Sequence, residues 1–279
     1  MPEGLDKLAG AVGDTLKTAP TVYEDAIQPT VQEIGKFVAR VPRAINAAFS
    51  GLDKWILNRE YAIDETKKLL EIKLENVDPE KIVTPEAYVA VPAIQAISYS
   101  MNSEELRNLY ANLLAKAMNS DTKNEIHPSF IEIIKQMSPI DSLVFKTIMQ
   151  RESNPIIDLV YNKYESDFPI AVESRTILEN VTDINIAPVE TICISIENLI
   201  KQGLISIPED KAYSDDTIYD CILKSQFYLI KHQSYPVTPD GFIFSSKKKT
   251  IVKTHLGDLF YKICVEAVKN PVSMESKTF

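Results

Sequence analysis

The chain has 279 residues, of which 25% are charged and 45% hydrophobic, a balance that excludes wholesale disorder. Its 30 basic and 39 acidic residues give a net charge of −9, so any contact with nucleic acid or anionic lipid needs a local basic patch. The three cysteines are widely spaced, which argues against a disulfide framework and indicates a reducing compartment. With only three histidines, no metal cage of the usual His and Cys type is expected.

No targeting or membrane-spanning segment is expected. The N-terminus lacks a basic region followed by an apolar one, so it does not resemble a signal peptide. No stretch reaches about 18 apolar residues without a charge. These features predict a cytoplasmic protein.

The first part of the chain has helical periodicity. Prolines divide the first 60 residues into short segments, one of which carries an apolar stripe at three- and four-residue spacing (Val31, Ile34, Val38 and Val41). Further helices are predicted over residues 64–77, 85–100, 103–117 and 129–137. Ser103 is expected to cap the third of these, and Pro92 to kink or break the second. We therefore predict an all-helical bundle domain over residues 1–137.

From Ser138 onward the pattern changes. Ser138-Pro139-Ile140-Asp141 is typical of a helix start, and that helix is predicted to run to about Gln150. Residues 156–161 fit either a strand or a helix. A helix over 188–202 ends at Gly203 and passes into an alternating strand, as helices do before the wing of a winged-helix domain. Residues 242–244 and 250–252 are expected to form a hairpin around Ser245–Lys249, and Thr254 to cap a last helix.

The chain is thus expected to be mainly α, with an N-terminal helical bundle followed by a winged-helix-like α+β domain. The second domain is predicted over 138–268, with a C-terminal tail at 269–279. Few glycines occur, which disfavours an all-β fold. No Gly/Ser-rich linker marks a domain boundary.

Six sequence blocks occur in a recognisable order. They are Tyr23–Pro29, Pro42–Ala48, Pro79–Pro85, Glu105–Ala115, His127–Pro139, and Thr254–Phe260 together with Cys264. In this order the chain resembles the Abi-alpha (abortive infection alpha) family of bacterial proteins over about residues 20–265. The most specific blocks are His-Pro-Ser-Phe from His127 and Ala-Asn-Leu-Leu-Ala from Ala111.

The resemblance implies a bacterial or prophage-encoded protein that takes part in defence against bacteriophage. It implies an accessory or effector role in which the infected cell stops growing or dies. It carries no established catalytic mechanism, so no active-site residues are transferred from the family.

His127 and Ser129 form the most distinctive local sequence. A catalytic interpretation would make His127 a general base beside Ser129, but side chains two residues apart at a helix start are expected to diverge unless a turn bends them together. We interpret the pair as a structural corner, with Pro128 in the first turn and His127 hydrogen-bonded to a neighbouring helix. No serine lies in a Gly-x-Ser-x-Gly context and no glycines form a phosphate loop, so no catalytic or cofactor-binding residue is assigned.

The densest basic cluster is Lys247, Lys248 and Lys249 with Lys253. On a wing it could contact phosphates or a protein partner. The predicted recognition helix carries Glu190, Glu197 and only Lys201, which is unusual for a major-groove reader. A solvated hairpin tip is therefore the favoured interpretation.

Residues 5–57 offer another surface. Their apolar stripes, with Lys36, Arg40 and Arg43 on the polar side, could lie on a membrane. Packing on the rest of the helical domain or on a second subunit explains the same pattern and is favoured.

Together these observations predict a phage-defence protein that acts by binding protein or nucleic acid and by self-association rather than by catalysis, without a cofactor or metal. We expect a homo-oligomer, with a phage or host protein as a further partner. Two alternatives stay open. One is a membrane-acting effector whose N-terminal helices lie at the inner face of the membrane, and the other is a winged-helix DNA-binding regulator.

Overall fold

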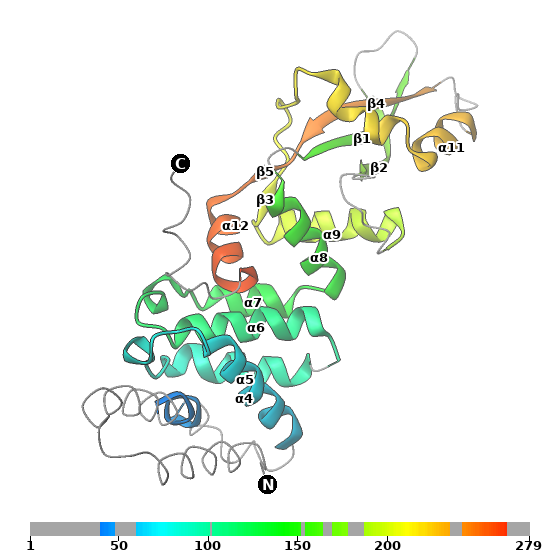
Figure 1. Ribbon diagram of the computed structural model, residues 1–279. Coiled ribbons are helices and arrows are strands. Elements are labelled where there is room, and N and C mark those ends of the chain that lie inside the picture. The colour runs from blue at the N-terminus through cyan, green and yellow to red at the C-terminus, as the bar shows by residue number, and fades with distance from the viewer. Residues whose placement is uncertain are drawn as a thin grey trace, which may run out of the picture.

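The computed structural model of the chain describes residues 40–47, 60–100, 102–151, 154–163, 169–177, 187–234 and 242–266 (Figure 1). These parts are mostly helical and include two small antiparallel sheets, which confirms the predicted mainly α class. The predictions for residues 1–39 and 48–59, and for the tail at 269–279, lie outside the described residues.

Helices fill the first half of the described chain where the periodicity predicts them. Their bounds are α4 (Glu60–Leu74), α5 (Ala87–Tyr99), α6 (Glu104–Ala117) and α7 (Ser129–Lys135). Residues 40–47 are also helical, and short 3-10 turns lie at Pro79–Lys81 and Lys123–Glu125. Ser103 caps α6 as expected, because its Oγ accepts a hydrogen bond from the Leu106 N–H at 3.3 Å. Pro92 does not break α5, which continues to Tyr99.

Helix α8 (Pro139–Gln150) begins with a reciprocal capping box. The Asp141 N–H donates to Ser138 Oγ at 3.1 Å, and the Ser138 N–H donates to Asp141 Oδ2 at 2.7 Å. Two backbone donors at the start of the helix are thereby satisfied, which explains why the helix begins where the sequence signature predicts.

The larger sheet has three antiparallel strands in the order β2-β1-β4. They are β1 (Pro155–Lys163), β2 (Pro169–Ile177) and β4 (Phe242–Thr250). Residues 156–161, which fitted either a strand or a helix, are therefore strand. The hairpin predicted within 242–252 is wrong, because residues 242–250 form one continuous strand. The nine residues of β1 pair without interruption with β4, from Pro155 opposite Thr250 to Lys163 opposite Phe242.

The smaller sheet joins two segments that lie far apart in the sequence. Helix α9 (Val189–Lys201) is followed by Gly203, whose φ of 74° is a left-handed conformation that favours glycine. Strand β3 (Ile205–Ser206) follows and pairs with β5 (Val252–Lys253). Between these strands lie β4 and three short helices, η4 (Asp216–Tyr219), α10 (Asp220–Leu223) and α11 (Gln226–Ser234). After β5 come α12 (His255–Phe260) and the π-helix η5 (Tyr261–Val265).

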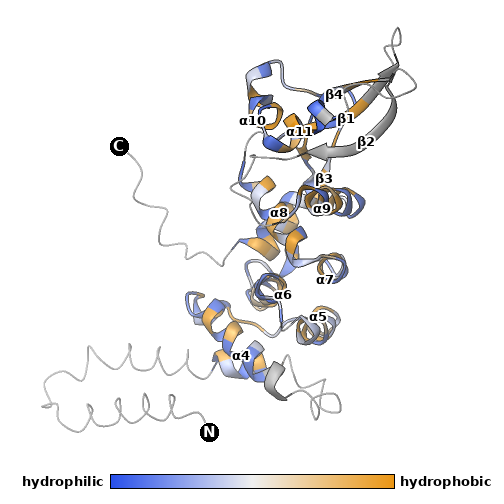
Figure 2. Ribbon diagram, turned by 90° about the vertical axis from the view of Figure 1, so that its right-hand side faces the viewer, coloured by the Kyte–Doolittle hydropathy of each residue, from blue (hydrophilic) through white to orange (hydrophobic). Residues whose placement is uncertain are grey.

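One hydrophobic core runs through the helical part of the molecule. Figure 2 shows α5, α6, α7 and α9 nearly end-on in a column, with β1 and β4 above them. Phe260 of α12 lies between Phe130 and Phe145, with ring centroids 5.6 Å from each. This core continues across residue 137, and a smaller one lies beside the sheet around Ile157, Leu159, Tyr219, Ile222 and Phe244. The domain boundary at residue 137 stays a prediction.

Candidate interaction site

The His127 and Ser129 side chains meet at the start of α7. Ser129 Oγ lies 2.6 Å from His127 Nδ1, and the Ser129 N–H donates to the same nitrogen at 3.1 Å. The side chains therefore do not diverge, because the tight turn through Pro128 folds the imidazole back over the helix start. The hydrogen bond from His127 to a neighbouring helix stays a prediction. Among the described residues no carboxylate orients the other ring nitrogen, so the pair lacks the third member of a catalytic triad.

The Ala-Asn-Leu-Leu-Ala block joins α6 to the C-terminal helix. Asn112 Nδ2 donates to the carbonyl oxygens of Cys264 at 2.8 Å and of Val265 at 3.3 Å. The Lys116 Nζ donates to the carbonyl of Lys262, and burial lowers the pKa of Lys116. The two side chains, one helical turn apart on α6, thus satisfy the carbonyls left open where the π-helix ends.

The closing Thr-His-Leu-Gly-Asp-Leu-Phe block fixes α12 against the turn after α9. Thr254 Oγ1 donates to the Gly203 carbonyl at 2.6 Å and accepts from the Gly257 N–H at 2.9 Å. Gly257 is buried, and a Cβ there would lie 2.0 Å from the Leu204 carbonyl oxygen. Glycine is therefore the residue that allows this close approach.

The predicted basic cluster lies within strands and faces carboxylates. In β4, Lys247 Nζ is 3.0 Å from Glu209 Oε2. Lys248 Nζ is 2.6 Å from Asp216 Oδ1 and 5.4 Å from the centroid of the Tyr219 ring. The structure therefore brings these lysines together on one strand and balances their charge with acids from the segment after β3.

The other two lysines of the cluster are also engaged. Lys249 Nζ lies 2.8 Å from Asp158 Oδ2 of β1 and 2.8 Å from Glu209 Oε1, with only 8% of its side chain exposed. Burial disfavours its charged form, but the hydrogen bonds to Asp158 and Glu209 outweigh burial and raise the pKa of Lys249. Lys253 of β5 donates to the Met149 carbonyl at 2.7 Å. Binding of nucleic acid or a partner by the four lysines stays a prediction.

The Glu209 carboxylate makes stability depend on pH. Hydrogen bonds from Lys249 and Lys247 lower the pKa of Glu209 from 4.5 to about 2. The stabilisation is therefore complete above about pH 4.5 and lost as the pH falls toward about 2. Since 75% of the Glu209 side chain is exposed, we expect Glu209→Gln to cost less than about 1 kcal/mol at pH 7. Thermal unfolding at several pH values should show the difference from wild type shrinking below about pH 4.5, and a constant difference would contradict this assignment.

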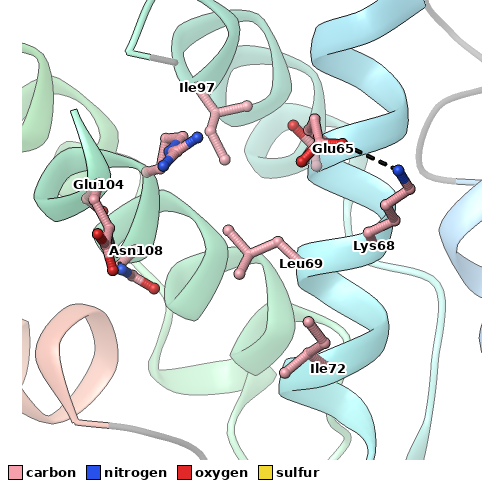
Figure 3. A pocket seen from close by; sticks show the side chains of 9 residues that line it. Glu65, Lys68, Leu69, Ile72, Ile97, Glu104 and Asn108 are labelled. Atoms are coloured by element: carbon pink, nitrogen blue, oxygen red, sulfur yellow. Dashed lines mark hydrogen bonds and ion pairs between the residues drawn. The ribbon is translucent and has the colours of Figure 1, made fainter. Parts of the chain in front are cut away.

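A groove opens between α4 and α6 near the end of α5. It encloses about 330 Å³ and is lined by Glu65, Thr66, Lys68, Leu69, Ile72, Ile97, Glu104, Arg107 and Asn108. Figure 3 shows Leu69 and Ile97 pointing into the space between these helices, with Glu104 and Asn108 on the facing side. Ile72 lies on the open side with 65% of its surface exposed. We call this feature the α4–α6 groove.

A second cavity extends the groove along α6. It encloses about 370 Å³, shares Glu104 and Asn108 with the α4–α6 groove, and continues between Lys73 of α4 and Lys146 of α8. Lys73 and Lys146 have no ion-pair partner among the described residues, and burial lowers the pKa of Lys73. This face of α6 therefore offers apolar side chains bordered by charges of both signs.

Sequence reasoning did not single out the groove. The periodicity of α4 identified Leu70 and Leu74, both fully buried, as the core-facing residues. Ile72 falls outside that pattern, and an isoleucine between Glu71 and Lys73 on the polar side of the helix was the available signal. Because the opposite wall of the groove comes from α6, the groove could not be predicted from the periodicity of α4 alone.

Other kinds of site receive no support from the described residues. No three side chains of His, Cys, Asp or Glu within them are placed to hold a metal ion. None of the helices described in the structure is both long and apolar enough to cross a membrane.

The comparison with known families covers four of the six sequence blocks described above, and the blocks at Tyr23–Pro29 and Pro42–Ala48 lie outside the matched residues. The sequence model of the family described as abortive infection alpha matches residues 58–264, which is more than two thirds of the chain. This range contains the blocks at α6, α7 and α12, whose roles in capping and packing are given above. No curated protein and no solved structure matches the chain significantly. The family suggests a part in abortive infection, a defence against phage. The chain belongs to the abortive infection alpha family.

Proposed function

We propose that the protein acts in abortive infection by binding and self-association rather than by catalysis, and that the α4–α6 groove receives an amphipathic helix of a phage or host protein. The groove carries this proposal. Leu69, Ile72 and Ile97 give it an apolar lining between two packed helices. Helical partners bind such grooves through apolar side chains at three- and four-residue spacing.

The charges at the rim support a protein as the occupant. Arg107 and Glu104 line the groove and have no ion-pair partner among the described residues. An amphipathic helix carries charged residues beside its apolar face, so it can pair with both. Such pairs contribute to specificity and to the rate of association more than to affinity.

We further propose that residues 138–268 form a winged-helix-like module that also binds protein. Helix α9, the turn at Gly203 and the paired strands β3 and β5 support this interpretation. Residues 207–251 would then be an insertion in the wing, and they carry β4 with its lysines.

The nucleic-acid alternative is less well supported, because those lysines would have to leave their carboxylate partners to reach phosphates. If the module did bind DNA, the affinity should fall steeply with salt and depend on Lys247 and Lys248. The membrane alternative rests on residues 5–57, most of which lie outside the described residues.

The proposal predicts that Ile72→Asp abolishes protection while leaving the fold intact. A carboxylate in the groove would be desolvated by a bound helix, so partner binding should weaken by more than about tenfold. Because Ile72 is 65% exposed, unfolding stability should change by less than about 0.5 kcal/mol. The measurement is the efficiency of plating of phage on bacteria that express each variant, with thermal unfolding of the purified proteins.

Ile194→Asp is the matched control. Ile194 lies on α9, is 67% exposed, and lies outside the groove. Protection by Ile194→Asp at the wild-type level, with loss in Ile72→Asp, would support the groove. Loss in Ile194→Asp alone would instead assign partner binding to the second module.

A further inference from the structure

The outer face of α5 is unusual in a chain of this composition. Residues 87–103 contain no Asp, Glu, Lys or Arg, although 25% of the whole chain is charged. A surface helix normally carries charged residues on its solvent side. Tyr88 is nevertheless 61% exposed and Tyr99 is 71% exposed.

The inner side of α5 is already buried against neighbouring helices. Its buried residues are Val89, Ala90, Ala93, Ile94, Ala96 and Ile97, and the helix contacts α4, α6 and α7. The outer face comprises Tyr88, Pro92, Gln95 and Tyr99, which recur at four- and three-residue spacing. Three helical turns separate the two tyrosines, so they lie on one line about 16 Å apart.

A hollow lies beside Tyr99 on this face. It encloses about 290 Å³ and is lined by Pro92, Gln95, Ala96, Tyr99, Ser100, Leu106, Tyr110, Ile134, Lys135 and Met137. Most of this lining is apolar or aromatic. Exposed tyrosines next to an apolar hollow, with charges depleted, match the composition found at the centre of protein interfaces.

We propose that the outer face of α5 binds a second copy of this chain, with the two α5 helices packed antiparallel about a two-fold axis near Gln95. The inference rests on the self-association in the proposed function and assigns its surface. Two copies that each carry a charge of −9 repel one another. At a two-fold axis a residue also faces its own copy, so a charge there would meet a like charge. A charge-free face avoids both costs.

The antiparallel arrangement also matches the two tyrosines with the hollow. Because Tyr88 and Tyr99 lie on either side of the axis, each copy's Tyr88 is placed opposite the hollow beside the other copy's Tyr99. A helix of 13 residues is about 20 Å long, so the interface is at the small end of the range for stable complexes. We therefore expect a dimer with a Kd in the micromolar range.

Gln95 allows a test with little risk to the fold, because Gln, Glu and Lys have similar helix propensities. Sedimentation velocity over a range of concentrations would measure dimerisation of wild type, Gln95→Glu and Gln95→Lys. Each variant alone should dimerise at least tenfold more weakly than wild type, and an equimolar mixture of the two should dimerise about as well as wild type. Gln233→Glu and Gln233→Lys, on the exposed surface of α11, are the matched controls and should leave the Kd unchanged.

The outcomes separate this inference from the proposal on which it rests. A dimer whose Kd is the same in all variants would overturn the α5 interface while leaving self-association standing. A wild-type protein that stays monomeric at about 100 µM, far above the expected Kd, would overturn both. Binding of that monomer to vesicles of phosphatidylethanolamine and phosphatidylglycerol, if lost in Gln95→Glu, would assign the face to a membrane instead. Recovery in the Glu and Lys mixture supports direct contact between the two Gln95 positions. If each variant instead dimerised weakly because its monomer fold was altered, mixing the two variants would not restore dimerisation.

Discussion

Replacing Gly257 with alanine should destabilise the protein by at least about 3 kcal/mol. The added Cβ would lie 2.0 Å from the Leu204 carbonyl oxygen and 3.2 Å from Thr254 Oγ1. The first contact is with backbone that belongs to the turn before β3, so no side-chain rotation relieves it. Helix α12 would have to move away from the turn and carry Phe260 out of its place between Phe130 and Phe145. Urea unfolding followed by circular dichroism would measure the loss.

Gly203→Ala provides the comparison. Gly203 has a positive φ, but the nearest atom to an added Cβ is Leu256 Cδ2, at an ordinary 3.7 Å. The cost there is the strain of alanine in a left-handed conformation, about 1–2 kcal/mol. We expect Gly257→Ala to be clearly the worse of the two. Equal stabilities would show that the approach of α12 to the Leu204 turn is looser than described.

Lys249→Met should destabilise the fold by about 3–5 kcal/mol, because it removes the lysine that pairs with the largely buried Asp158 carboxylate. The Lys249 side chain is 8% exposed and that of Asp158 is 14% exposed, and their charged atoms are 2.8 Å apart. In Lys249→Met the Asp158 carboxylate would stay largely out of water and lose the ammonium group that lies 2.8 Å away. The measurement is again the free energy of unfolding at neutral pH.

Two further variants test that explanation. The double variant Lys249→Met with Asp158→Leu removes both charges and should recover most of the lost stability. Lys247→Met removes a lysine that is 44% exposed and should cost less than about 1 kcal/mol. If the double variant were as unstable as the single one, packing rather than the broken ion pair would explain the loss. Because loss of Lys249 is expected to destabilise the fold, Lys247 is the more informative position for tests of nucleic-acid binding.

The helices could be predicted from sequence because the signals that start them are local. Ser138 and Asp141 cap each other's backbone within one turn, and the Ser103 hydroxyl accepts from the Leu106 N–H in the first turn of α6. The short strand β3 could also be predicted, since Gly203 and the alternation that follows it lie within a few residues. In these cases the residues that decide the structure are neighbours in the chain.

The lysine strand could not be predicted, because what decides its structure is distant in sequence. A run of three lysines indicates a solvated turn when it is read alone. Lys249 is tolerated inside a strand because Asp158 and Glu209, which are 91 and 40 residues away, bring carboxylates to it. Strand β5, which pairs with β3, could not be predicted for a similar reason, because β4 and three short helices lie between the two strands in the sequence. The walls of the α4–α6 groove likewise come from three separate helices.

The bonds from Asn112 and Lys116 to the end of η5 also bear on how the protein is made. The two ends of the Asn112–Cys264 bond are 152 residues apart, a stretch that takes roughly 8–30 s to translate at 5–20 residues per second. During that time α6 and α7 emerge without Phe260, Ile263 and Cys264, which complete their packing. A nascent chain therefore exposes apolar surface until nearly all of the described residues have been synthesised. A product that ends before residue 255 would lack these three side chains and should be cleared by proteases.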